Sequence, residues 1–433
     1  MGSGQLPATY KVVYYSSQAD ANANQSPIPN PENYTNTPDN PADSTDEIFA
    51  RVVTIDSPNT CNPATTSFKL LVKINQPPVL FADFREAYCP LSEIKIAENF
   101  TITDSDSDGL DFFTIQISEG YSNPTDLLEL TGTHPTVTAR PFDITEGKLI
   151  LEPTAPATEI AYADLELAVR DIIFTSTDPN ISGERSFSFT IGDANYLPAT
   201  EHFYEFISKL DITWQQARTE AESKTYYGLK GYLATILSEE ENQICAEQII
   251  GQGWIGANDE NNEGDWRWVT GPEGLEDGGN GLNFWNGGGF FDAGNPVIGM
   301  YANWNNCVNP GPIPGDPAIE PNDCCDDAID GQENYAHITS NQIGCLGTWN
   351  DLANVTSTSG NYQSKGYVVE YGGTLGDPVL NISTSTSIYI PQITNFDPVK
   401  RNCTGGTMTF TATASEGEIY WYDAPTGGNL VET

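Results

Sequence analysis

Apolar and polar residues alternate along three short stretches in the first 77 residues. These stretches are Tyr10–Tyr15, Ile48–Ile55 and Ser67–Ile74, and each is bounded by turn-forming residues. A loop rich in Pro and Asn separates the first stretch from the second. Alternation of this kind predicts antiparallel strands with one buried face. We therefore predict a first β unit over residues 1–77.

A second group of strand-like stretches lies between residues 78 and 198. They are also short and bounded by turn residues, and they are Glu93–Thr103, Phe112–Ser118, Lys148–Leu151, Leu165–Phe174 and Ser186–Ile191. This pattern predicts a second β-sandwich.

The second unit also contains an acidic stretch, Asp104–Gly109, which has the start of an EF-hand calcium loop. Position twelve of such a loop would be Ile115 instead of a bidentate Glu, and it falls in a predicted strand. We therefore interpret the stretch as an acidic turn. A looser calcium site between domains is the alternative.

The pattern changes from strand to helix after a strand predicted at His202–Phe206. Thr213–Gln216 has the capping-box pattern, and apolar residues follow it at helical spacing. Ser238 begins a second predicted helix in the same way, and Tyr232–Ile236 between the helices is a predicted buried strand. Cys245 lies on the second helix, where we interpret it as a small buried hydrophobic residue. Beyond Gly253 the chain is rich in Gly and aromatic residues, and we expect long loops ordered by a bound metal.

Oxygen-bearing side chains are concentrated between residues 320 and 351. Glu320-Pro321-Asn322 opens this segment, Trp349-Asn350-Asp351 closes it, Glu333 lies between them, and no Lys or Arg interrupts it. Such donors suit a hard divalent cation. Three carboxylates roughly 5 Å apart would repel one another by about 3 kcal/mol per pair, and one dication removes this repulsion.

The two amides of these motifs can serve both an ion and a ligand. The carbonyl oxygens of Asn322 and Asn350 can bind the ion, while their NH2 groups donate to a ligand hydroxyl. A cis Glu320–Pro321 bond would turn the flanking side chains toward the same ion. We therefore predict a calcium site whose coordination is completed by neighbouring sugar hydroxyls.

With Trp254-Ile255-Gly256, Glu263–Gly271 and Gly366–Tyr371, these motifs give residues 199–373 a resemblance to the C-type lectin domain of large bacterial surface adhesins. The resemblance implies an α+β fold with long loops. It also implies that the Glu-Pro-Asn triplet selects sugars with equatorial 3- and 4-hydroxyls, such as mannose, N-acetylglucosamine, glucose and fucose.

The same resemblance implies an auxiliary calcium site. Asp259, Glu263 and Asp323 match its ligands, and Glu333 would be shared between the two ions. An acidic turn is the alternative interpretation of Asp259 and Glu263. Animal members of the family have a disulfide where this chain has Ala221 and Val369, so we expect the fold to form without it.

The flanking segments resemble other adhesin repeats. Residues 1–77 resemble the end of an immunoglobulin-like repeat, 78–198 a cadherin-like repeat, and 374–433 the start of another immunoglobulin-like repeat. The predicted fold is therefore multidomain, with all-β sandwich repeats around an α+β lectin-like domain, and the chain is expected to be a fragment of a longer adhesin. Cys61 would lack its disulfide partner, because the first strand of such a repeat, which usually carries that cysteine, is missing here. The alternative is that Cys61 is a free buried thiol.

Four cysteines cluster around the predicted site loops: Cys307, Cys324, Cys325 and Cys345. In an exported protein we expect two disulfides, with the adjacent cysteines taking separate partners. A zinc site is the alternative, but it lacks paired C-x2-C spacing. The segment from Cys324 to Gln332 is an insertion relative to the family.

The charge of the chain excludes some partners. Asp and Glu number 60 against 18 Lys and Arg, a net charge of −42, which argues against nucleic acid and anionic membrane surfaces. No apolar run is long enough to insert into a membrane. No signal-peptide core follows Met1–Gly4, so export signals would lie outside the chain. We expect an extracellular, cell-surface protein that uses Ca2+ and binds glycans.

An enzyme is the less favoured interpretation. Glu320 and Glu333 could act as a glycosidase pair, but the predicted metal already needs them. The three histidines are scattered along the chain and suggest no nucleophile and base. Two further interpretations are a lectin-like domain that binds protein or ice, and a non-catalytic appendage of a carbohydrate-active enzyme. Trp285, Trp304 and Tyr335 could stack on a sugar or belong to the core.

Overall fold

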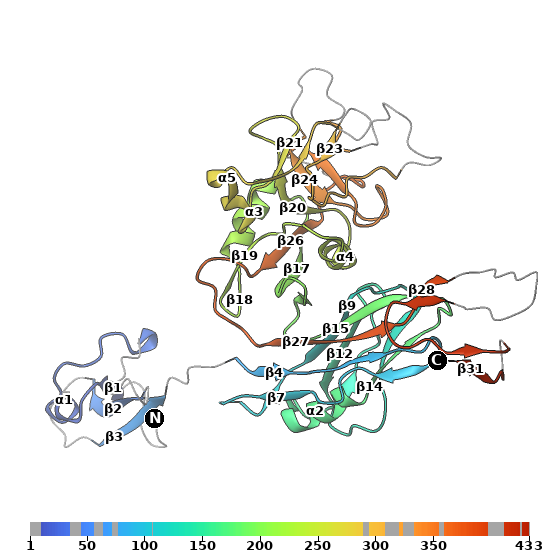
Figure 1. Ribbon diagram of the computed structural model, residues 1–433. Coiled ribbons are helices and arrows are strands. Elements are labelled where there is room, and N and C mark those ends of the chain that lie inside the picture. The colour runs from blue at the N-terminus through green and yellow to red at the C-terminus, as the bar shows by residue number, and fades with distance from the viewer. Residues whose placement is uncertain are drawn as a thin grey trace, which may run out of the picture. The chain divides into compact units, whose positions relative to one another are not determined.

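A computed structural model shows two compact units, residues 1–76 and 77–433. The residues that it describes are 10–34, 45–55, 64–71, 77–105, 107–288, 294–307, 320–323, 333–354, 359–396, 411–424 and 427–432 (Figure 1). Among them, no helix is long and apolar enough to cross a membrane.

The first unit is built on an antiparallel sheet in the order β1-β2-β3, with β1 at Tyr10–Tyr15, β2 at Thr45–Thr54 and β3 at Thr65–Leu71. All three predicted strands are confirmed, with ends shifted by a few residues. A short helix α1 (Gln18–Ala23) and a 3-10 helix η1 (Pro31–Asn33) follow β1. Arg51 of β2 donates to the carbonyl oxygens of Ala21 and Asn22, both at 2.7 Å, and so holds α1 against the sheet. Cys61 lies outside the described residues.

The second unit begins with two sheets. The larger has the order β11-β12-β9-β15-β27-β5 and the smaller β10-β14-β6. Their bounds are β5 Arg85–Ala87, β6 Glu93–Lys95, β9 Phe113–Glu119, β10 Asp126–Leu130, β11 Val137–Ala139, β12 Lys148–Pro153, β14 Ile172–Ser176, β15 Gly183–Ile191 and β27 Ser383–Ile390. Short pairs flank them: β4 (Val79–Phe81) with β7 (Thr101–Thr103), and β8 (Gly109–Leu110) with β13 (Ile160–Ala161).

The two sheets share one hydrophobic core. Their inward residues are fully buried, among them Ile115 of β9 and Phe189 of β15. The ring of Phe174 on β14 lies 5.5 Å from that of Phe187 on β15 and so joins the sheets. Ile115 lies in a strand, which supports interpreting Asp104–Gly109 as a turn; Asp106 is outside the described residues.

The prediction of a strand at Leu165–Phe174 was wrong over most of its length. Residues Tyr162–Arg170 form helix α2, and only the end of the predicted strand belongs to β14. Leu165, Ala168 and Val169 are buried at i, i+3 and i+4, which is the spacing of one helix face. The predicted strand Glu93–Thr103 is likewise divided, into β6 and β7.

The position of strand β27 shows that the predicted division of the chain at residue 374, with 374–433 as a separate repeat, was wrong. It pairs antiparallel with β15 from Gly183↔Ile390 to Thr190↔Ser383 and parallel with β5, so it belongs to the larger sheet of the second unit (Figure 1). We therefore call residues 77–191 with 383–390 the two-sheet part. Residues 192–382, which we call the loop-rich part, are inserted between β15 and β27.

The chain then continues through the pairs β28–β29 and β30–β31, with bounds Ile393–Phe396, Ala412–Ala414, Trp421–Tyr422 and Leu430–Glu432.

The loop-rich part contains an eleven-stranded sheet with the path β16-β17-β26-β20-β21-β22-β23. Strands β18, β19, β24 and β25 are joined to this path. The bounds are β16 Asn195–Leu197, β17 His202–Ser208, β18 Thr225–Tyr226, β19 Leu229–Leu233, β20 Gly253–Asn258, β21 Asp265–Trp268, β22 Leu282–Asn286, β23 Asn295–Pro296, β24 Tyr335–Ile338, β25 Trp349–Leu352 and β26 Gly366–Tyr371. The segment after Gly253 thus contains more regular structure than we predicted.

Both predicted helices of this part are present. Helix α3 (Trp214–Ser223) has the complete capping box at Thr213 and Gln216. Helix α4 (Glu239–Gln248) is capped by the Ser238 side chain, which accepts from the Glu241 backbone N–H. Two short turns, η2 (Glu273–Leu275) and α5 (Glu276–Gly279), follow β21. Cys245 is free and fully buried, as predicted.

Candidate functional site

The β24–β25 hairpin positions the second predicted motif. The two strands pair with Ala336 opposite Asp351 and His337 opposite Asn350. Asn305 connects this hairpin to the first motif, because the Asn305 N–H donates to the Trp349 carbonyl at 2.8 Å and the Glu320 N–H donates to the Asn305 carbonyl at 3.0 Å. The Glu320–Pro321 peptide bond is cis. The two motifs therefore meet although about 30 residues separate them.

Hydrogen bonds join the two motifs through side-chain and backbone groups. Asn350 Nδ2 donates to Glu320 Oε1 at 2.6 Å. The Asp351 carboxylate accepts from the Asn322 N–H, at 3.1 Å to each oxygen, and from the Asp323 N–H at 2.9 Å. Four predicted site residues, with Asp323 of the predicted auxiliary site, are thus brought together.

Glu333 lies beside this group. Its backbone N–H donates to Asp323 Oδ1 at 3.1 Å. Its carboxylate is one of the charges that raise the pKa of Glu320. We use the name acid–amide cluster for Glu320, Asn322, Asp323, Glu333, Asn350 and Asp351.

The centre of the acid–amide cluster is buried and contains two carboxyl groups. Glu320, Asn350 and Asp351 are 5%, 1% and 3% exposed. Burial, and then the charges of Asp351 and Glu333, raise the pKa of Glu320 well above its ordinary value. Burial also raises the pKa of Asp351. No cation is among the main influences on the pKa of either group, whereas a hydrogen bond between the Glu320 and Asp351 carboxyl groups influences both. Two buried carboxyl groups this close resist being ionised together unless a cation compensates their charge.

Two oxygens of the cluster have unused hydrogen-bonding capacity. Glu320 Oε2 and Asn350 Oδ1 are buried, and neither has a partner in the described part of the chain. Leaving such an atom unpaired costs about 1–3 kcal/mol. Both atoms are hard oxygen donors of the kind that calcium takes.

The donor set is mixed rather than purely acidic. Within the described ranges, no three His, Cys, Asp or Glu side chains are grouped closely enough to hold a metal ion by themselves. Calcium also accepts amide and backbone oxygens as ligands. Glu320, Asn350 and Asp351 together offer two carboxyl groups and one amide oxygen, and these residues fit a calcium ion.

The predicted auxiliary residues lie next to the cluster. The Asp259 N–H donates to the carbonyl of Asn334, the neighbour of Glu333, at 3.3 Å. Asp259 Oδ2 accepts from the Gly264 N–H at 2.8 Å, whereas its buried Oδ1 has no partner among the described residues. Burial, with contributions from Glu263 and Asp351, raises the pKa of Asp259 to about 8. Residues predicted for the two sites are thus neighbours in the structure, and Asp259 also lines a polar cavity of about 320 Å³.

A disulfide supports the loops around the cluster. Cys307 and Cys345 are bonded, with their Cα atoms 5.7 Å apart. The bond joins the end of the described range 294–307 to the turn that precedes β25. The prediction that Cys324 and Cys325 take separate partners within this group of four was therefore wrong, because Cys307 and Cys345 are bonded to each other. The same bond commits two sulfurs of the alternative zinc site. Cys324 and Cys325 lie outside the described residues.

The aromatic residues singled out in the sequence belong to the core. Trp285, Trp304 and Tyr335 are all buried. Trp349 is also buried, where its indole N–H donates to Asn242 Oδ1 at 2.7 Å and its ring packs against Trp268. Trp349, directly before Asn350 and Asp351, thus packs in the core.

Sequence reasoning missed Tyr362, which is 47% exposed. Burial raises its pKa, and the charges of Glu320 and Glu333 raise it further, so its hydroxyl is within electrostatic range of the cluster. The Asn361 side chain donates to the Gln342 carbonyl at 3.1 Å and anchors this turn. A single aromatic residue within a polar turn was the available signal.

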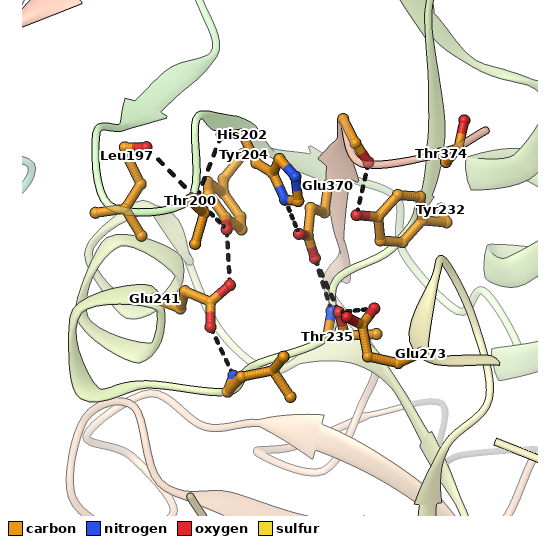
Figure 2. A network of polar contacts seen from close by, with 12 residues as sticks. Leu197, Thr200, His202, Tyr204, Tyr232, Thr235, Glu241, Glu273, Glu370 and Thr374 are labelled. Atoms are coloured by element: carbon orange, nitrogen blue, oxygen red, sulfur yellow. Dashed lines mark hydrogen bonds and ion pairs between the residues drawn. The ribbon is translucent and has the colours of Figure 1, made fainter. Parts of the chain in front are cut away.

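A second buried polar group lies elsewhere in the loop-rich part (Figure 2). His202 Nδ1 lies 2.7 Å from Glu370 Oε1, and Glu370 Oε2 accepts from the Thr235 N–H at 2.9 Å and its hydroxyl at 3.2 Å. The Thr235 hydroxyl is also 3.0 Å from Glu273 Oε2. These contacts connect β17, β26, the end of β19 and η2.

Glu241 of α4 extends this group, which we call the His202–Glu370 network. Its two carboxylate oxygens accept from the Tyr204 hydroxyl at 2.9 Å and from the Leu237 N–H at 2.7 Å (Figure 2). Burial, and then the charge of Glu370, raise the pKa of Glu241 to about 7. Sequence analysis missed the network. A glutamate inside the fully buried strand β26 was its only signal.

Three comparisons place the chain among known proteins. Residues 1–78 match the Flavobacterium inter-domain disulphide bond domain family. Over 325 residues, or 72% of the chain, the sequence is 31% identical to halomucin from Haloquadratum walsbyi (strain DSM 16790 / HBSQ001); the match covers 3% of halomucin. A solved structure of a calcium-independent type II antifreeze protein matches 42% of this chain and 93% of its own, with 16% identity and a TM-score of 0.23.

The comparisons also indicate where the protein is located in relation to the cell. The match to an inter-domain disulphide family and the Cys307–Cys345 bond both indicate an oxidising environment. Together with the similarity to halomucin, they support the predicted extracellular location.

Proposed function

We propose that the acid–amide cluster binds calcium and that neighbouring hydroxyls of a sugar complete the coordination of the ion. The unpaired buried oxygens Glu320 Oε2 and Asn350 Oδ1, beside the carboxylate of Asp351, are the observation that carries this proposal. A dication supplies charge compensation for the buried carboxylates and coordination places for two hydroxyls.

In this proposal the residues have distinct roles. Glu320, Asn322, Glu333, Asn350 and Asp351 hold the main ion. Asp259, Glu263 and Asp323 hold an auxiliary ion and share Glu333 with the first. The amide NH2 groups of Asn322 and Asn350 donate to the sugar hydroxyls, and the carboxylates accept from them. Mannose, N-acetylglucosamine, glucose and fucose are the expected sugar types.

The proposed setting is a surface adhesin. Residues 199–373 would be its C-type lectin-like domain, with immunoglobulin-like and cadherin-like repeats around it. The two capped helices, the closing strand β26 beside β17 and the cis bond before Pro321 support the lectin-like assignment. The Cys307–Cys345 disulfide suits an exported protein.

A glycan array probed with the full chain tests the proposal. We expect mannose-type glycans to bind in calcium and to be released by a chelator. Glu320→Gln should lose this binding, because it removes a charged ligand but keeps the size of the side chain. Glu129→Gln is the matched control, because Glu129 is an exposed residue of β10 in the two-sheet part. Binding that persists in chelator, or in Glu320→Gln, would refute the mechanism.

A further inference from the structure

The insertion of the loop-rich part has a mechanical consequence. The chain leaves the larger sheet after β15 and returns to it in β27, and the Ile191 N–H donates to the Ile382 carbonyl at 3.0 Å. Everything between these residues lies outside the direct path from the start of the two-sheet part to its end.

A parallel set of hydrogen bonds connects that start to that end. The Leu80 N–H donates to the Asn381 carbonyl at 2.8 Å, the Ser387 N–H to the Phe84 carbonyl at 3.0 Å, and the Tyr88 N–H to the Tyr389 carbonyl at 2.9 Å. The register runs from Arg85↔Ser387 to Ala87↔Tyr389. We use the name clamp for residues 80–88 together with residues 381–389.

Tension along the chain would load the clamp in shear. Residues 1–76 precede residue 80, and strands β28–β31 follow residue 389, so a pull on the chain reaches both sides of the clamp. Because the two strands are parallel, the pull draws one toward its N-terminus and the other toward its C-terminus. The clamp bonds lie across this direction and are therefore stretched together, whereas a hairpin pulled at its ends opens bond by bond.

Other contacts hold the clamp strands in the sheet. Along its other edge β27 pairs with β15, and its buried Ile388 and Ile390 belong to the core. The guanidinium of Arg85 lies 4.4 Å from the ring centroid of Tyr389. The same group pairs with Glu184 of β15 at 3.3 Å and with Glu416, beyond β29, at 2.9 Å.

We propose that the clamp is a load-bearing element that transmits chain tension directly from residues 80–88 to residues 381–389, so that the loop-rich part carries no tension. A ligand site in the loop-rich part then keeps its geometry while the chain is under load. The mechanical role itself does not depend on the ligand that this part binds.

Single-molecule force spectroscopy on the full chain, pulled from its two ends under reducing conditions, tests this role. We expect the second unit to resist until the clamp ruptures and then to lengthen in one step of roughly 1,000 Å, at about 3.4 Å for each residue between Tyr88 and Asn381. A first step of roughly 650 Å, the length of residues 192–382 alone at the same rise, would overturn the proposal. So would a first step of only a few residues, which would show that β4 and β5 peel away.

Two further measurements separate the clamp from general stability. Pulling between the C-terminal end and a handle at the fully exposed Ile298 uses the wild-type fold but sends force through the loop-rich part, which should then unfold first and at lower force. Ser387→Pro removes the donor to Phe84 and should lower the rupture force. Arg140→Pro removes a donor to Ile150 at the opposite edge of the same sheet and should leave the force unchanged. Equal forces in the two pulling directions would contradict the role, even if Ser387→Pro fails to fold.

Discussion

The loop-rich part contains two sets of buried acidic residues, and they differ in whether all their side-chain oxygens are hydrogen-bonded. In the His202–Glu370 network, both oxygens of Glu370 and both oxygens of Glu241 have partners. In the acid–amide cluster, Glu320 Oε2 and Asn350 Oδ1 have none among the described residues. Burial of carboxylates therefore does not by itself indicate a binding site. Unpaired buried oxygens beside a second buried carboxyl group do, because nearly all buried polar atoms of native folds have a partner and an exception calls for one.

The largest expected effect comes from removing two donors of the cluster. Glu320→Ala with Asn350→Ala should abolish calcium binding measured by titration calorimetry. The loss should exceed the roughly 10- to 100-fold decrease in affinity that follows removal of an outer-shell partner. The fold should survive, because the double variant removes buried charge together with the amide that partners it. Calcium affinity equal to that of the Glu129→Gln control would place the ion elsewhere.

The matching change in the network should affect stability instead. Glu370→Ala leaves His202 and the Thr235 N–H without their acceptor, and we expect it to lower the free energy of unfolding by about 2–4 kcal/mol. Urea denaturation in chelator measures this loss. Glu370→Gln, which keeps an acceptor oxygen, should lose less. A calcium affinity that falls in parallel with stability would mean that the two groups are not separate.

A smaller effect is the pH dependence of stability that the network produces. The pKa of Glu241 is raised to about 7 by burial, compared with about 4.3 in an unfolded chain. The folded state therefore binds the proton more tightly, and this contribution to stability is complete below the unfolded pKa and is lost as pH rises through 7. We expect a loss on the order of 1–3 kcal/mol between pH 4.5 and 7.5.

Glu241→Gln is the control for that experiment, because it keeps an oxygen to accept from Tyr204 but does not titrate. The difference in unfolding free energy between wild type and variant, both measured in chelator, should decrease as pH rises. His202, whose pKa the Glu370 carboxylate raises against the effect of burial, acts in the same direction. A difference that does not vary with pH would show that Glu241 is charged throughout.

The smallest expected effect is at Tyr362. If the half-exposed ring contacts a sugar bound at the cluster, Tyr362→Ala should weaken sugar binding by about 1 kcal/mol, the usual contribution of one aromatic contact. Calcium affinity and melting temperature should not change. Tyr362→Phe keeps the ring and should bind the sugar nearly as well as wild type. Equal loss in both variants would assign the effect to the hydroxyl.

Local features of the fold could be predicted from the sequence. The caps at Thr213 and Ser238 were found because a cap needs only residues three positions apart. Helix α2 was missed because Leu165, Leu167 and Val169 alternate as in a strand, while Leu165, Ala168 and Val169 also fit one face of a helix. The membership of β27 in the larger sheet depends on pairing with β15, almost 200 residues earlier, and no local pattern specifies that pairing.

The two sets of acidic residues also differed in whether local sequence could predict them. Residues of the acid–amide cluster occur in two compact motifs, so their chemistry was visible before their contacts were known. The His202–Glu370 contact joins residues 168 positions apart, and neither lies in one of the two predicted metal-site motifs. The sequence could therefore indicate which residues might serve an ion, but not which carboxylates would find partners and which would remain unpaired.

The hydrogen bond between Ile191 and Ile382 also bears on how such chains can evolve. Because the two ends of residues 192–382 meet side by side, the coding segment between them can be exchanged as a cassette while both strands of the host sheet are retained. A replacement must supply ends with the same separation and cover the contact that Gln243 makes with Tyr121. Recombination at these two points could diversify what the molecule recognises without redesigning the scaffold that carries it.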